Sequence, residues 1–69
     1  KNFSKSNTTK FVTKMIQRQL KKAGFYKDYA VDGDWGKGTD NAIKQWRKSC
    51  GWSNVATIGT KALKKLLSY

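Results

Sequence analysis

The chain has 69 residues, and 15 lysines and arginines against four acidic residues give it a formal net charge of +11. A chain this short buries only about 60% of the surface that it exposes when unfolded, so it can form one compact core but no deep pocket. The absence of histidine and glutamate, together with a single cysteine, argues against a zinc site, an internal disulfide, a thiol nucleophile with its base and a glycosidase carboxylate pair. We therefore expect no catalysis, no metal and no cofactor.

The positive charge predicts attraction to polyanions, and the candidates are nucleic acid, anionic lipid and the phosphate-rich polymers of bacterial walls. No apolar run approaches the about 20 residues that a membrane span requires, and nothing resembles a signal peptide. Because the first residue is Lys1 and not Met, we expect the chain to be a fragment or a processed product.

Residues 1–8 are polar and predict a linker or N-terminal tail, in which Phe3 can dock on the core, and residues 9–69 are the expected domain. A first helix is predicted from Thr9 to Ala23. Gly24 is placed to end it, with Phe25 making the hydrophobic contact that follows such an end. The predicted apolar stripe of this helix consists of Val12, Ile16, Leu20 and Ala23, widened by Phe11 and Met15.

A long connection over residues 25–38 contains four aromatic side chains and lies beside all the acids of the chain, so we expect it to be packed. A second helix is predicted from Thr39 to Ser49, with Thr39 as its cap and Gly51-Trp52 as its end. A third helix is predicted from Gly59 to Leu67. The expected fold is all-α, a small three-helix bundle with a long structured loop between the first two helices.

These landmarks occur in an order that resembles the peptidoglycan-binding domain family, the small three-helix module of many wall hydrolases and phage endolysins. The resemblance rests on Ile16-Gln17, Leu20, Gly24-Phe25-Tyr26, Asp32-Gly33-Asp34-Trp35-Gly36-Lys37-Gly38-Thr39, Ala42-Ile43-Lys44-Gln45-Trp46, Gly51-Trp52 and Ile58-Gly59-Thr60-Lys61-Ala62 with Leu66. It covers about Val12 to Leu67. Arg47 and Ala62 depart from the family pattern, in which Gln and Thr are usual.

The resemblance implies a non-catalytic module that binds peptidoglycan, through its peptide stem or its glycan, and the positive charge adds an expected attraction to anionic wall polymers. It also implies a covalently linked catalytic domain that takes part in bacteriolysis, and a place outside the cell, in the wall or in a phage product released at lysis. We expect a monomer that binds nucleic acid only non-specifically.

Two groups of residues follow from these patterns. The structural group is expected to turn the chain, cap the second helix or fill the core, and it consists of Gly24, Asp32, Gly33, Gly36, Thr39, Trp46 and Gly51. The ligand-binding group is expected to line a shallow groove between the loop and the start of the second helix, and it consists of Tyr26, Tyr29, Asp34, Trp35, Lys37, Asn41 and Gln45.

Two other functions remain open from the sequence. Three helices with a large positive charge also fit a small DNA-binding domain, although the first connection is far longer than the turn of a helix-turn-helix. Helices with aromatics and lysines are typical of cationic membrane-active peptides, although the glycine-ended helices favour a globular core.

Overall fold

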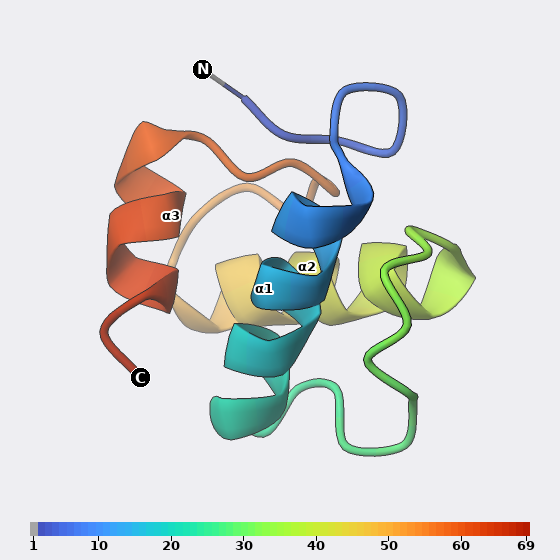
Figure 1. Cartoon of the computed structure of the whole chain (residues 1–69). Coiled ribbons are helices and arrows are strands. Elements are labelled where there is room, and N and C mark those ends of the chain that lie inside the picture. The colour runs from blue at the N-terminus through green and yellow to red at the C-terminus, as the bar shows by residue number, and fades with distance from the viewer. Residues whose placement is uncertain (1) are drawn as a thin grey trace.

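The computed structural model describes residues 2–69 and contains α1 (Lys10–Lys22), α2 (Lys37–Ser49) and α3 (Thr60–Leu66). Helix α1 crosses in front of α2, and α3 lies to one side of both (Figure 1). Within this described part the only β pairing consists of isolated bridges, one between Phe3 and Ile58 and one between Ser4 and Asn7. The predicted all-α, three-helix fold is confirmed.

Helix α1 begins after Thr9, whose hydroxyl accepts a hydrogen bond from the Val12 amide at 3.2 Å. Its buried stripe contains Ile16 and Leu20, both fully buried, as predicted. The prediction was wrong for Phe11, which is 80% exposed. At about 100° per residue, Phe11 lies about 140° around the helix from Ile16, which turns its side chain away from the core.

Both predicted glycine ends are confirmed. Gly24 and Gly51 have φ of +89° and +81°, a left-handed conformation that glycine adopts without a steric cost. Beyond each glycine an aromatic residue donates its amide to the helix, Phe25 to the Leu20 carbonyl at 2.9 Å and Trp52 to the Arg47 carbonyl at 3.0 Å. These bonds satisfy carbonyls that the helix end would otherwise leave free.

Helix α2 begins at Lys37, two residues before the predicted start, and its N-cap is Gly36, which supplies no side-chain bond. The prediction that Thr39 caps the helix was therefore wrong. Thr39 lies inside the first turn and is only 1% exposed, with its hydroxyl 3.0 Å from Nε2 of Gln17 on α1. The hydroxyl thus joins two helices and does not cap one.

The core lies where the three helices meet, around the fully buried Trp46. The Trp46 indole N–H donates to the Tyr69 hydroxyl at 3.1 Å, and its ring meets Trp52 edge-on with centroids 5.8 Å apart. Phe3 packs against this core, as expected. The buried apolar set consists of Ile16, Leu20, Tyr26, Trp35, Ala42, Ile43, Trp46, Ile58, Ala62 and Leu66.

Gln19 attaches α3 to α1 by donating from Nε2 at 3.0 Å to the carbonyl of Leu66, the last residue of α3, which receives no bond from within the helix. In the part of the chain that the structure describes, no helix is long and apolar enough to cross a bilayer.

Candidate functional site

The loop between α1 and α2 is hydrogen-bonded to α1 through the side-chain amide of Gln17, which is fully buried. Its Oε1 accepts the Gly33 amide at 2.9 Å, and its Nε2 lies within hydrogen-bonding distance of the Asp34 carbonyl at 2.9 Å and of Asp32 Oδ1 at 3.2 Å. A buried polar group that loses its hydrogen-bond partner costs free energy, so these bonds fix the position of the loop relative to α1. We call Gln17, Asp32, Gly33, Asp34 and Thr39 the loop network.

Within the loop network, Asp32 Oδ1 also accepts the Asp34 amide at 2.9 Å, the side-chain bond expected of an Asp in a tight turn. The pKa of Asp32 is lowered, mainly by this amide and in addition by the Gln17 side chain and the charge of Lys10, against a smaller opposing effect of desolvation. The folded loop therefore favours the ionised form of Asp32.

Two residues of the predicted ligand-binding group lie in the core. Tyr26 is 4% exposed, and its hydroxyl shares a hydrogen bond with the Thr39 hydroxyl at 3.3 Å. Trp35 is 7% exposed, and its indole N–H donates to Asp40 Oδ1 at 2.6 Å. Neither ring presents a face on which a ligand could stack, so a ligand surface must be sought among the other members of the group.

Three other members of that group come together. Tyr29, Asn41 and Gln45 line a hollow of about 400 Å³ between the loop and α2, and a second hollow of about 450 Å³ adjoins it through Phe25 and Gln45. Asp34 and Lys37 are exposed but do not line either hollow. We call the combined surface the α2 groove, lined by Gly24, Phe25, Lys27, Asp28, Tyr29, Asn41, Ala42, Gln45, Lys48, Ser49 and Asn54.

The local structure holds the Tyr29 ring over the start of α2. A Cβ on Gly38 would lie 2.9 Å from the ring, so the close approach depends on glycine. The ring also lies 5.2 Å from that of Tyr26, and Lys21 Nζ donates to the Tyr29 carbonyl at 3.1 Å. With 47% of the residue exposed, Tyr29 combines a fixed ring with an accessible surface.

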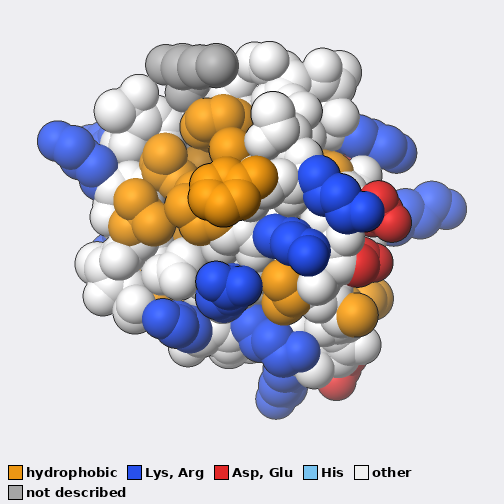
Figure 2. Space-filling view, in the orientation of Figure 1, with side chains coloured by type: hydrophobic (Ala, Val, Ile, Leu, Met, Phe, Trp, Pro, Cys, Tyr) orange, Lys and Arg blue, Asp and Glu red, His pale blue; other side chains and the backbone are white. Residues whose placement is uncertain are grey.

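Charge in the α2 groove is mixed, whereas the chain as a whole is strongly positive. Lys27, Asp28 and Lys48 stand along the groove, and no histidine or glutamate occurs in the chain. Figure 2 shows lysine and arginine side chains spread over one face of the molecule, with acidic side chains gathered at one edge. Among residues 2–69 no group of three or more potential metal ligands is present.

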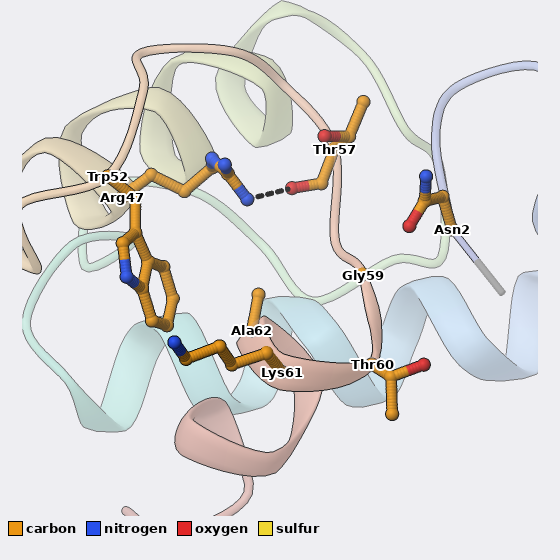
Figure 3. A pocket seen from close by; sticks show the side chains of 8 residues that line it. All are labelled: Asn2, Arg47, Trp52, Thr57, Gly59, Thr60, Lys61 and Ala62. Carbon is orange, nitrogen blue, oxygen red and sulfur yellow. Dashed lines mark hydrogen bonds between the residues drawn. The ribbon is translucent and has the colours of Figure 1, made fainter.

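A separate cavity of about 400 Å³ lies on the other side of α2, between the Trp52 ring and the segment that leads into α3 (Figure 3). The sequence patterns did not predict it. Its lining combines residues that are far apart along the chain, and the available signals were the departures at Arg47 and Ala62, which both line it. We call it the Trp52 cavity, lined by Asn2, Arg47, Trp52, Thr57, Gly59, Thr60, Lys61 and Ala62.

The glycine-ended helices, the packed loop and the shallow open surfaces define a small three-helix domain without a deep pocket among its described residues. The family model described as "Putative peptidoglycan binding domain" matches residues 13–55, which include most of α1, the loop and α2. The chain therefore belongs to the peptidoglycan-binding domain family, and its ligand class is peptidoglycan. No curated protein and no solved structure shows significant similarity to it.

Proposed function

We propose that this chain attaches a bacterial or phage wall hydrolase to its substrate, and that the α2 groove is the surface that contacts peptidoglycan. One observation supports the groove above other surfaces. Tyr29, Asn41 and Gln45, from two separate segments of the sequence, line the same hollow. Each of them has the chemistry that a sugar or a short peptide requires.

The Tyr29 ring suits a sugar face or the methyl groups of a peptide stem. Aromatic rings offer a large contact area at a low cost in conformational entropy, and this ring is already held by Gly38 and Tyr26 before any ligand arrives. The amides of Asn41 and Gln45 can both donate and accept, so they match the N–H and C=O groups of acetamido sugars and peptide bonds.

Charges of both signs fit a peptide stem better than a plain polyanion. A stem peptide carries carboxylates and, in many walls, a free amine. Lys27 and Lys48 are placed to pair with the carboxylates, and Asp28 is placed to pair with the amine. This pattern favours peptidoglycan over DNA at the α2 groove, since a DNA backbone offers only negative charge.

Attachment would help a linked hydrolase by mass action alone. A catalytic domain held on an insoluble polymer meets its substrate at a high effective concentration without any new chemistry. This function places the parent protein at the cell wall, either as an exported bacterial enzyme or as a phage product released at lysis.

Co-sedimentation with purified sacculi tests the proposal. The sacculi are first stripped of phosphate-containing polymers, so that only peptidoglycan remains. We expect the chain to pellet at low salt and at physiological salt. Tyr29→Ala should reduce the affinity about fivefold, since an aromatic contact contributes roughly 1 kcal/mol.

Phe11→Ala is the matched control, because Phe11 is an exposed aromatic outside the α2 groove. It should bind as the unchanged chain does. A chain that stays in the supernatant at low salt would contradict peptidoglycan binding itself. Equal losses in the two variants would contradict the assignment to the α2 groove.

A further inference from the structure

We propose that the Trp52 cavity is a second binding site, which takes a phosphorylated polyol such as a glycerol phosphate unit. This inference goes beyond peptidoglycan binding and does not depend on the α2 groove. The two sites are geometrically independent. At about 100° per residue, Arg47 lies about 160° around α2 from Gln45, so the sites occupy opposite sides of the helix.

The first support is a fixed guanidinium. Arg47 donates from Nε to the Ser53 carbonyl at 2.8 Å, from Nη1 to the Thr57 carbonyl at 3.2 Å and from Nη2 to Ser53 Oγ at 3.4 Å. A guanidinium has five N–H donors, so two remain after these bonds. All of these partners are neutral, so these bonds hold the positive charge in place without neutralising it.

The second support is the arrangement around that charge. The Trp52 ring lies with its centroid 5.8 Å from the Arg47 guanidinium carbon, and Figure 3 shows the Lys61 amine reaching toward the same ring. Two cations, Arg47 and Lys61, thus line the same cavity as the Trp52 ring. None of the described residues that line the cavity is an aspartate.

The chemistry of this lining selects the class of ligand. Arginine binds phosphate oxygens through its planar fork, and lysine binds them as a point charge. The Trp52 ring can contact the carbon chain of a polyol, and the Asn2 amide and the Thr57 hydroxyl lie in the lining as hydrogen-bonding groups. A volume of about 400 Å³ admits one such unit but not a nucleic-acid duplex.

The net charge of +11 supports a repeated ligand. A chain of phosphodiester-linked polyols presents many equivalent units, and the positive surface would raise the local concentration of such a polymer around the cavity. The Trp52 cavity would then fix one unit of the polymer, while the other lysines contribute attraction without selectivity.

The test is a ¹⁵N-detected titration of the folded chain with glycerol 3-phosphate, with glycerol and inorganic phosphate as the two part-ligands. We expect saturable shifts of the Trp52 indole N–H and the Arg47 Nε–H with glycerol 3-phosphate, and an affinity at least about fivefold weaker for either part-ligand. Equal affinity for inorganic phosphate, or for lactate as a carboxylate, would overturn the proposal. Absence of saturable shifts at these two groups would also overturn it.

Lys61→Gln removes one cation from the cavity, and Lys14→Gln makes the same change at an exposed position on α1. Loss of a charge-assisted bond should weaken glycerol 3-phosphate binding about tenfold in Lys61→Gln and less than twofold in Lys14→Gln. Both positions are exposed, so folding is not at risk. Equal effects of the two variants would show attraction by net charge alone and would overturn the site.

Two competitors identify the source of the phosphorylated polyol. Displacement by soluble poly(glycerol phosphate) but not by phosphatidylglycerol vesicles supports a wall polymer, and displacement by vesicles supports a lipid headgroup. A short DNA duplex that displaces glycerol 3-phosphate from the Trp52 indole with equal effectiveness would overturn the selectivity for a polyol.

Discussion

The side-chain amide of Gln17 on α1 lies 3.0 Å from the hydroxyl of Thr39 in the first turn of α2, and both residues are almost completely buried. This contact connects the two helices on either side of the long loop. The same amide accepts the Gly33 N–H and holds the Asp34 carbonyl. The position of the loop over α1, and with it the wall of the α2 groove, therefore depends on one glutamine.

The first prediction concerns this glutamine. Gln17→Leu should lower the free energy of unfolding by about 2–4 kcal/mol, because the buried Gly33 N–H loses its acceptor and the buried Thr39 hydroxyl loses the Nε2 donor. Urea denaturation followed by tryptophan fluorescence measures the loss. Gln45→Leu, the same change at an exposed position, should cost less than about 0.5 kcal/mol. Similar losses in the two variants would show that the network adds nothing beyond helix propensity.

The second prediction concerns pH and Asp32, whose pKa is lowered in the folded chain chiefly by the Asp34 amide. A carboxyl with a lowered pKa stabilises the fold above its unfolded pKa, near pH 4, and this contribution is lost as the pH falls through the folded pKa. The stability difference between the unchanged chain and Asp32→Asn should therefore be larger at pH 7 than at pH 3.

Thermal unfolding at the two pH values measures this difference. Asp28→Asn makes the same change in charge outside the loop network and is the matched control. A difference for Asp32→Asn that stays constant between pH 7 and pH 3 would mean that its carboxylate is not stabilised by the loop.

The third prediction separates binding from stability. Gly38→Ala places a Cβ 2.9 Å from the Tyr29 ring and must move that ring. Alanine favours the helix by about 1 kcal/mol, which offsets part of the strain, so the melting temperature should change little. Affinity for stripped sacculi should fall about fivefold because the ring is no longer held. Unchanged affinity would show that the position of Tyr29 does not matter for binding.

The fourth prediction concerns the end of α2. Gly51 has φ of +81° and open space around its missing Cβ, so Gly51→Ala costs only backbone strain, about 1–2 kcal/mol of stability. Gly51→Asn should cost less, because asparagine enters the left-handed region more readily. Equal losses for Ala and Asn in chemical denaturation would contradict this cause.

The sequence predicted those features that local signals decide. The ends of α1 and α2 follow from Gly24-Phe25 and Gly51-Trp52, because a glycine in the left-handed conformation followed by an apolar residue is itself the stop signal. The buried face of α2 follows from the spacing of Ala42, Ile43 and Trp46. The family match over residues 13–55 covers the same part of the chain and ends before α3.

Features decided by distant residues were not predictable. Thr39 has the chemistry of a cap, but its hydroxyl instead lies in the interior, where it accepts a hydrogen bond from the Gln17 amide of another helix. Tyr26 and Trp35 have the chemistry of a binding surface, but Thr39 and Asp40 satisfy their polar atoms in the interior. The Trp52 cavity brings together residues from both ends of the chain, which no local pattern records.

The most direct test of the central claim, that the α2 groove contacts peptidoglycan, is chemical-shift mapping of the ¹⁵N-labelled chain with a purified soluble muropeptide. The account predicts that the largest saturable shifts occur at the backbone of Tyr29 and at the side-chain amides of Asn41 and Gln45. Shifts confined to the lysine-bearing faces, with these groups unmoved at saturation, would contradict it.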